Sequence, residues 1–295
     1  MGTEDISPRY LDLDAWSASD QLRALHESQV EAVAAVEPAL AAIASAVESA
    51  VPRLRRGGRI IYAGAGTSAR IGVQDGAELF PTFNWPSAQV AFVIAGGEAA
   101  LLRAVENAED SAEDGVQRIA ELGVGANDVI LGIAASGNTP FTVGAVTEAR
   151  GRGALTVGIA NNAGSKLLAA AEHPVLIETG AEAIAGSTRL KAGTAQKVAL
   201  NLFSTAVMAQ LGHVYRGMMV DMRPTNAKLR HRSEQMVSQI AGCSADVAIN
   251  SLGKAEGDIK TASLVAKGLG VEAAIALLAK HQGNLRAALA EAELA

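Results

Sequence analysis

Short runs of apolar residues recur through the middle of the chain and alternate with stretches of helical spacing. Such continuous apolar strands, separated by helices, are typical of a parallel sheet that is covered on both faces. The pattern therefore predicts an α/β fold with a doubly wound parallel sheet flanked by helices. The five expected strands are residues 59–63, 89–94, 128–133, 154–159 and 174–177.

The two ends of the chain have a different pattern from its middle. Residues 1–16 read as an irregular arm, and Ser17-Ala18-Ser19-Asp20 resembles a capping box that opens a helix. Pro38 is expected in the first turn of a second helix. Two helices before any strand suggest a packing or dimerisation element. After about Gln239 the pattern becomes purely helical, which predicts a small helical domain.

Three segments follow from this organisation. We expect an N-terminal arm with helices over residues 1–50, an α/β domain over residues 51–239, and a small helical domain over residues 240–295.

Composition narrows the possible functions. Hydrophobic residues make up 49% of the 295 residues and charged residues 19%, which supports a sizeable core. The formal net charge of −6 disfavours nucleic acid as the main partner. One cysteine cannot form an internal disulfide, and the acidic start shows no signal peptide. No run approaches the roughly 18 uncharged apolar residues of a membrane span. We therefore expect a cytoplasmic protein without a membrane partner.

Three glycine-bearing turns rich in hydroxyl groups follow expected strands. Residues 64–68 follow the first strand and residues 136–139 the third, while residues 186–188 precede a long helix that reaches about Leu211. Ligands in such folds bind beyond the carboxyl ends of the strands, and helix N-termini attract anions. The turns together predict a site for a sugar phosphate or a similar small anion. The alternative is ordinary helix capping, with Ser187 or Thr188 as an N-cap.

The phosphate motifs of nucleotide-binding proteins are incomplete here. The first turn has the Gly-x-Gly of a dinucleotide loop, but Ala69 stands where the third glycine is expected, and there is no Walker pattern. The five histidines are scattered without metal-ligand spacing, so we expect no metal site.

Two glutamates are candidates for acid–base chemistry. Glu78 lies near the end of the first α/β helix among apolar neighbours, and Glu109 stands beside Asp110 in a polar stretch. A carboxyl in apolar surroundings has a raised pKa and can act as an acid, while a second, ionised carboxylate can act as a base. The alternative, which composition alone favours, is that these are ordinary solvated helix residues.

Five segments together resemble the N-acetylmuramic acid 6-phosphate etherases of the sugar isomerase (SIS) superfamily. The similarity spans nearly the whole chain, and the fourth segment is specific to the etherases and their regulatory relatives. The segments are YAGAGTSAR at 62–70, ENAEDS at 106–111, GIAASGNTP at 132–140, GSTRLKAGTAQK at 186–197 and VDMRPTNAKLRHR at 220–232.

The resemblance implies a SIS-type sheet and cleavage of the D-lactyl ether of N-acetylmuramic acid 6-phosphate by elimination and then water addition, without a metal or other cofactor. It implies that Glu78 is the proton donor and Glu109 the base. It also implies a homodimer. The implied substrate-binding residues are Thr67, Ser68, Ser136, Asn138, Thr139, Ser187, Thr188 and Lys191.

Two other functions stay open at this point. An aldose–ketose isomerase of the same superfamily would share the three turns. A non-catalytic sugar-phosphate sensor would resemble the glucokinase regulatory protein, although the presence of both Glu78 and Glu109 argues against it.

Overall fold

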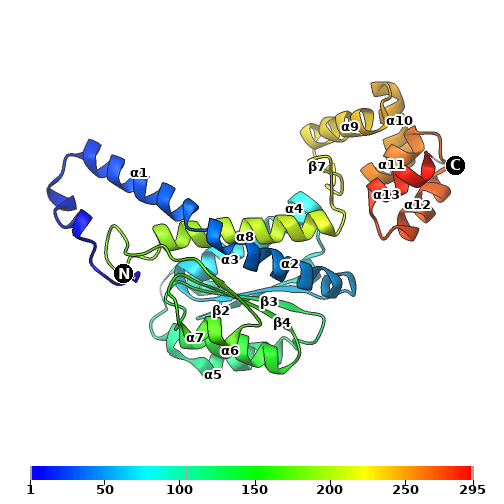
Figure 1. Ribbon diagram of the computed structural model, residues 1–295. Coiled ribbons are helices and arrows are strands. Elements are labelled where there is room, and N and C mark those ends of the chain that lie inside the picture. Colours follow the sequence, from blue (N-terminus) through cyan, green and yellow to red (C-terminus); the bar gives the residue numbers. More distant parts are fainter. Residues whose placement is uncertain (1, 104, 294–295) are drawn as a thin grey trace. The chain divides into compact units, whose positions relative to one another are not determined.

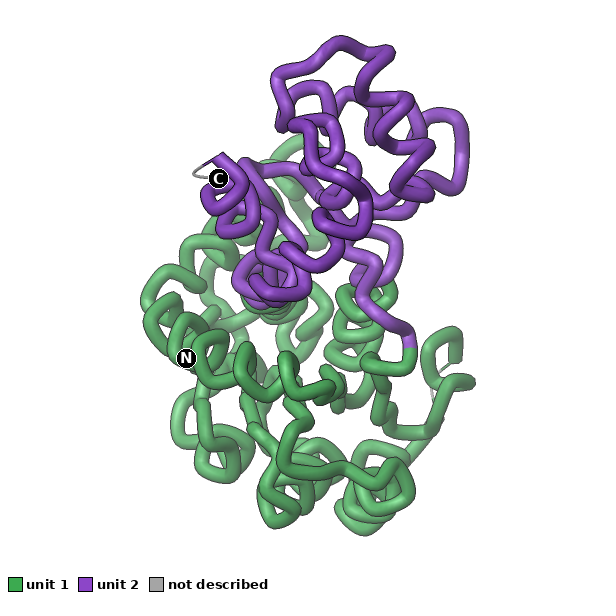
Figure 2. Tube along the Cα trace, turned by 90° about the vertical axis from the view of Figure 1, so that its right-hand side faces the viewer, with its two compact units in different colours: residues 1–77, 88–204 green, residues 78–87, 205–295 purple. Residues whose placement is uncertain are grey.

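The computed structural model describes residues 2–103 and 105–293. The chain packs as two compact units, shown in different colours in Figure 2. The larger unit contains residues 1–77 and 88–204, and the smaller contains residues 78–87 and 205–295. The smaller unit thus includes a short segment from the first third of the chain, which sequence pattern does not reveal. The segment boundaries expected after residues 50 and 239 stay predictions.

A five-stranded parallel sheet forms the centre of the larger unit. Its order is β2-β1-β3-β4-β5, so the direction of winding reverses between β1 and β3. Gly64 at the end of β1 pairs with Ile94 of β2 and Ile133 of β3, which brings the carboxyl ends of these strands level. The strands are β1 Ile60–Gly64, β2 Val90–Ile94, β3 Val129–Ala134, β4 Leu155–Ala160 and β5 His173–Leu176. All five expected strands are present, each displaced by about one residue, and the predicted fold class is confirmed.

Helices cover both faces of this sheet. Figure 1 shows α2, α3 and α8 on one side and α5, α6 and α7 on the other. The helices of the larger unit are α1 Ala18–Ala34, α2 Leu40–Arg55, α3 Gly66–Ala77, α5 Ala112–Glu121, α6 Pro140–Gly151, α7 Lys166–Ala170 and the first part of α8 Lys191–Gln210. Because the sheet is enclosed in this way, every residue of β1, β3 and β4 is buried, as a continuous apolar run requires.

The capping box predicted at residue 17 is confirmed at the first helix. The Ser17 hydroxyl accepts the backbone N–H of Asp20 at 3.2 Å, and α1 begins at Ala18. Pro38 lies in a 3-10 turn, Glu37–Ala39, that leads directly into α2. The α1 side chains Leu22 and Val30 are exposed, so this helix carries apolar surface that the chain itself does not cover.

One helical stretch, Ala18–Arg55, contains an 18-residue window of mean hydropathy 1.7, enough by length and composition to cross a membrane. This stretch contains Glu37, Pro38 and Glu48, so it is not the uncharged apolar run that the expectation concerned. A second stretch is long and apolar enough only when two helices are counted together, Ile259–Ala266 and Val271–Lys280, and these two helices meet at a bend of 120°. Within the first stretch, the buried side chains Ile43 and Val47 belong to α2, which packs on β3, β4 and β5. A helix buried in a protein core can be as long and as apolar as a helix that crosses a membrane.

The smaller unit is helical apart from one two-stranded hairpin. Its helices are α4 Leu79–Phe83, the end of α8, α9 Ala227–Ala241, α10 Ala245–Lys254, α11 Ile259–Ala266, α12 Val271–Lys280 and α13 Leu285–Ala292, and its strands are β6 Val214–Tyr215 and β7 Met218–Met219. Val220, Val237 and Leu264 lie fully buried in its core. Beside this core, Asp221 Oδ2 lies 2.7 Å from His213 Nδ1 and 2.6 Å from the buried Lys260 Nζ.

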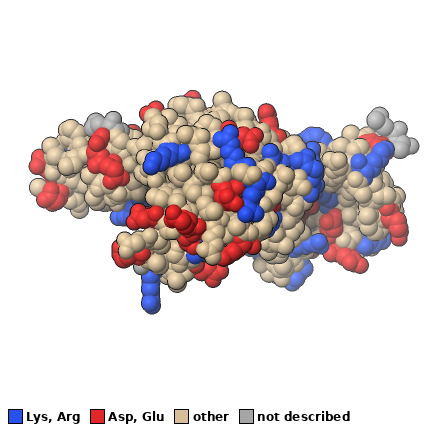
Figure 3. All heavy atoms as spheres, turned by 90° about the horizontal axis from the view of Figure 1, so that it is seen from below, with Lys and Arg blue, Asp and Glu red and all other residues tan. Residues whose placement is uncertain are grey.

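Charged side chains of both signs lie interspersed on the face shown in Figure 3. This agrees with 25 basic and 31 acidic residues in the sequence. An anionic ligand must therefore be attracted by local geometry, since charges of one sign are not gathered on this face.

A buried carboxylate joins β1, α3 and α8. Asp75 accepts hydrogen bonds from Tyr62 Oη at 2.8 Å, Asn201 Nδ2 at 2.6 Å and Ser204 Oγ at 3.1 Å. Burial, with the neighbouring Asp75 carboxylate, holds the pKa of Tyr62 well above its ordinary value, so the phenol stays a donor. All three side chains donate to the one carboxylate of Asp75, which therefore links β1, α3 and α8.

We expect Asp75→Leu to lower the free energy of unfolding by about 3 kcal/mol, because it leaves several buried donors without an acceptor. The measurement is urea denaturation followed by circular dichroism. The matched control is Asp114→Ala, which removes a half-exposed ion pair with Arg118 on one helix and should cost about 0.5 kcal/mol or less. Equal losses in the two variants would contradict this account of Asp75.

Candidate active site

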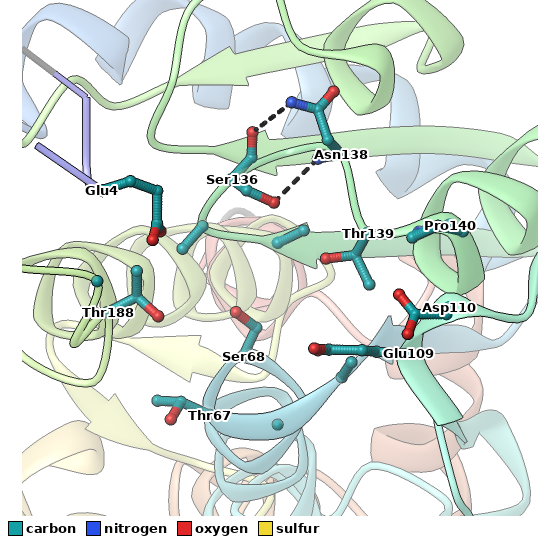
Figure 4. A pocket seen from close by; sticks show the side chains of 15 residues that line it. Glu4, Thr67, Ser68, Glu109, Asp110, Ser136, Asn138, Thr139, Pro140 and Thr188 are labelled. Carbon is teal, nitrogen blue, oxygen red and sulfur yellow. Dashed lines mark hydrogen bonds between the residues drawn. The ribbon is translucent and has the colours of Figure 1, made fainter. Parts of the chain in front are cut away.

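A hollow of about 450 Å³ opens beyond the carboxyl ends of β1 and β3, where the strand order reverses. This is the position at which doubly wound sheets bind ligands. Its volume suits a small sugar phosphate. Figure 4 shows its lining, which comprises Glu4, Ala65, Gly66, Thr67, Ser68, Glu109, Asp110, Ala134, Ala135, Ser136, Asn138, Thr139, Pro140, Gly186 and Thr188.

The turn after β1 contributes the first pair of hydroxyl groups. Helix α3 begins at Gly66, inside the glycine-bearing turn, so Thr67 and Ser68 lie in its first turn. Gly66 has a φ of 54°, a conformation that glycine adopts without strain. The early helix start brings both hydroxyls and the helix N-terminus to the edge of the hollow, where an anion is favoured.

The turn after β3 contributes the second pair. Ser136 Oγ accepts the Asn138 backbone N–H at 3.1 Å, and Thr139 stands at the N-cap of α6 without making a side-chain cap bond. The Thr139 hydroxyl points into the hollow in Figure 4. Gly137 has a φ of 66°, and a Cβ there would lie 2.2 Å from Ser165 Oγ, so this tight turn requires glycine.

Asn138 has a different role from its neighbours in this turn. Its Nδ2 donates to the Ser136 carbonyl at 3.3 Å, and its Oδ1 accepts the Lys166 backbone N–H at 3.1 Å. Both ends of the amide therefore hold the turn in place against α7. Asn138 lines the hollow, but its side chain shapes the hydroxyl-bearing turn.

The start of α8 is occupied by a carboxylate of the chain itself. The fully buried Glu182 accepts the backbone N–H groups of Lys191 at 2.8 Å and Ala192 at 2.9 Å. Sequence pattern suggested Ser187 or Thr188 as the cap and an anion site at this helix start. The helix instead begins at Lys191, and Glu182 caps it. The stretch contributes Gly186 and Thr188 to the lining.

Three carboxylates line the hollow. In Figure 4, Glu109 and Asp110 lie on one side and Glu4 on the other. The described lining contains no Lys or Arg. A second hollow of about 280 Å³ shares Thr67 and Glu109 with the first and includes Arg70 and Arg103. Positive charge therefore lies beside the site, and the lining of the site itself contains hydroxyl groups and carboxylates.

Glu4 reaches the hollow because the N-terminal arm is fastened beneath it. The buried Thr3 donates its N–H to Asn162 Oδ1 at 3.1 Å, and its carbonyl accepts the Gly186 N–H at 3.2 Å. Gly186 has a φ of 73°, and a Cβ there would lie 3.0 Å from Glu4 Oε2. Sequence reasoning did not single out Glu4, since no local pattern relates it to turns more than a hundred residues away.

Three of the predicted site residues are not in this lining. Glu78 is exposed and stands immediately before α4, in the smaller unit. Among the described residues, the Glu78 side chain is therefore not enclosed by apolar neighbours as the sequence suggested. Lys191 is buried with its Nζ 3.7 Å from Glu31 Oε2, and Ser187 lies in the turn before α8. In the described part of the chain, no three His, Cys, Asp or Glu side chains group as metal ligands.

Comparisons with known proteins agree with this geometry. Residues 42–150 match the family model of the glucokinase regulatory protein N-terminal SIS domain, and residues 111–206 match that of the SIS domain. A phosphoheptose isomerase structure from Francisella tularensis is similar in fold, with a TM-score of 0.53 at 20% identity, over 66% of this chain and 100% of that chain. These matches show that the sheet is that of SIS domains.

Similarity to whole proteins is much closer. An N-acetylmuramic acid 6-phosphate etherase from Deinococcus radiodurans is 48% identical over 292 residues, covering 99% of this chain and 96% of the relative. One from Cronobacter sakazakii is 46% identical over 288 residues, covering 97% of each. With this identity over nearly the full length, the chain belongs to the N-acetylmuramic acid 6-phosphate etherase family.

Proposed function

We propose that the protein cleaves the D-lactyl ether of N-acetylmuramic acid 6-phosphate, giving N-acetylglucosamine 6-phosphate and D-lactate in amino sugar recycling. The observation that carries this proposal is the hollow that Glu109 lines together with five hydroxyl side chains. Family membership supports the same reaction. The hollow thus offers a carboxylate that can act as a base, next to hydroxyl groups that can bind the sugar and its phosphate.

The chemistry proceeds by elimination and then addition. When the sugar ring opens, the C1 aldehyde acidifies the C2 proton, and Glu109 takes it. The resulting enolate expels the C3 ether oxygen, which Glu78 protonates as D-lactate leaves. Water then adds to C3 and restores a sugar hydroxyl. An alkoxide is a poor leaving group, so a positioned acid is needed as well as a base.

Hydroxyl side chains hold the substrate in this proposal. Thr67, Ser68, Ser136, Thr139 and Thr188 line the hollow. Hydroxyls and the first turns of α3 and α6 can bind an anion without a cation in the lining. Ser187 and Lys191 belong to the specific segment at residues 186–197, and contacts from them to the substrate stay a prediction.

A homodimer is part of the same proposal. Leu22, Val30 and Val33 on α1 are at least half exposed, and such apolar side chains on one helix favour association with a second copy. Glu78 lies outside the lining that holds Glu109, so a second copy is one way to complete the acid–base pair. We place the reaction in the cytoplasm, where recycled amino sugar phosphates are consumed.

The test is D-lactate release from N-acetylmuramic acid 6-phosphate by the purified protein, without added metal or nucleotide. We expect stoichiometric D-lactate and N-acetylglucosamine 6-phosphate. A ketose product without lactate would favour the isomerase. Sugar-phosphate binding by calorimetry without any turnover would favour the sensor.

A further inference from the structure

The second hollow, of about 280 Å³, adjoins the first at Glu109. Both hollows are lined by Glu109 and by the turn at residues 65–67. The rest of the second lining comes from Arg70 of α3 and from the segment between β2 and α5, which includes Arg103. The second hollow therefore adjoins the carboxylate that is proposed to act on C2 of the sugar.

The turn that carries Arg103 is held in place by hydrogen bonds to its backbone. The Arg103 N–H donates to the Ala99 carbonyl at 3.2 Å. Arg70 donates through Nε to the Leu101 carbonyl and through Nη2 to the Ala100 carbonyl, both at 2.9 Å. A carbonyl group carries no net charge, so these bonds fix the Arg70 guanidinium without neutralising it. The backbone at Arg103 is thus anchored, and two arginines bring positive charge to this hollow.

The two hollows differ in charge. The first is lined by three carboxylates and, among the described residues, by no Lys or Arg. The second has Arg70 and Arg103 to balance the carboxylates of Glu106 and Glu109. Within the described part of the chain, Arg103 forms no ion pair. Because like charges repel and opposite charges attract, an anionic group beside Glu109 is favoured in the second hollow over the first.

The connectivity of the sugar decides which anionic group lies beside Glu109. The substrate carries a phosphate on C6 and, through the ether oxygen on C3, the carboxylate of the lactyl group. C3 is bonded to C2, the carbon whose proton Glu109 is proposed to take, whereas C6 extends from C5 on the far side of the ring. With C2 at Glu109, the lactyl group can enter the second hollow. The phosphate then stays in the first, where hydroxyls and helix N-termini offer donors.

We propose that the second hollow binds the lactyl carboxylate of the substrate and that Arg103 is its ion-pair partner. An arginine guanidinium matches a carboxylate with two parallel N–H donors. This inference rests on the proposed function, from which the ligand and the place of C2 are taken. It adds a residue that recognises the part of the substrate that leaves. The product N-acetylglucosamine 6-phosphate has no lactyl group and gives Arg103 no partner.

The test uses three ligands that bind without reacting. The 1-deoxy analogue of N-acetylmuramic acid 6-phosphate cannot open to an aldehyde, so its C2 proton is not acidified and its ether stays intact. The second ligand is the same analogue with the lactyl carboxylate replaced by the neutral carboxamide. The third is N-acetylglucosamine 6-phosphate, which has the phosphate but no lactyl group. Calorimetry gives the three dissociation constants for each protein.

We expect wild type to bind the acid about 5- to 20-fold more tightly than the amide, between the effects of an exposed ion pair and of a charged hydrogen bond. Arg103→Met should bind the acid and the amide with equal affinity, because the partner of the carboxylate is gone. Its affinity for N-acetylglucosamine 6-phosphate should change by about twofold or less, since that ligand does not reach Arg103. If Arg103→Met keeps the wild-type preference for the acid, or weakens all three ligands equally, the proposal is wrong.

Arg152→Met is the matched control, because it removes the same charge at the other end of α6 from the first hollow. Arg152 is the C-cap of α6 and pairs with Glu148, whereas Thr139 at the N-cap lines the hollow. This variant should keep the wild-type preference for the acid. Arg103→Lys keeps the charge but not the paired donors, so it should keep part of that preference. An equal loss of preference in Arg103→Met and Arg152→Met would indicate a long-range effect of charge and would overturn the proposal.

The binding measurements separate this inference from the reaction, since none of them needs turnover. A wild type that releases no D-lactate but distinguishes acid from amide through Arg103 would refute the reaction and support the subsite. A wild type that releases D-lactate but binds acid and amide alike would refute the subsite and leave the reaction standing. Failure of wild type to bind any of the three ligands would refute both.

Discussion

Glu109→Gln is expected to lower kcat for D-lactate release by a factor of about 10²–10⁴, the usual contribution of a general base. Glutamine keeps the shape of the side chain but cannot take the C2 proton. Binding of N-acetylglucosamine 6-phosphate should change little, because the five hydroxyl side chains of the lining remain. The loss should therefore appear in kcat and not in the dissociation constant.

Proton exchange identifies the step that Glu109 serves. Wild type should exchange the C2 proton of the substrate with deuterated water, as seen by nuclear magnetic resonance, and Glu109→Gln should not. Glu113→Gln is the matched control, since Glu113 is an exposed glutamate in the first turn of α5, just after Glu109. Undiminished exchange in Glu109→Gln would assign the base to another carboxylate of the lining, Glu4 or Asp110.

Glu78→Gln should also lower kcat for lactate release by about 10²–10⁴, but it should leave the C2 exchange intact. The acid acts after the proton has been removed, when the C3 oxygen departs as an alkoxide. A variant that lacks the acid can still form the enolate and return it to substrate. The two variants should therefore differ in C2 proton exchange, which Glu109→Gln loses and Glu78→Gln keeps.

The same exchange assay, run beside a lactate assay, checks this expectation. Glu272→Gln is the matched control, because Glu272 is an exposed glutamate of the smaller unit, in the first turn of α12. Unchanged lactate release by Glu78→Gln would remove Glu78 from the mechanism. Loss of both exchange and release would place Glu78 before the enolate, in ring opening or in base catalysis.

Local patterns in the sequence predicted the fold class, all five strands and the cap of α1. These features depend on neighbours along the chain. Apolar runs define β1 and β3, and Ser17 caps the helix that follows it by accepting the N–H of Asp20, three residues further on. The turns that follow β1 and β3 were predictable for the same reason. Parallel strands end at one edge of the sheet, so Thr67 and Thr139 meet in one hollow.

Packing between distant segments decided the remaining features of the site. Glu4 enters the hollow through contacts of Thr3 with Asn162 and Gly186, and Glu182 replaces the expected cap of α8 from nine residues upstream. A buried hydrogen bond joins Ser68 to Gln196 across 128 positions. Each of these groups is a buried or confined polar side chain that must find a partner in space. Which partner it finds depends on how helices and strands pack, and neither periodicity nor composition carries that information.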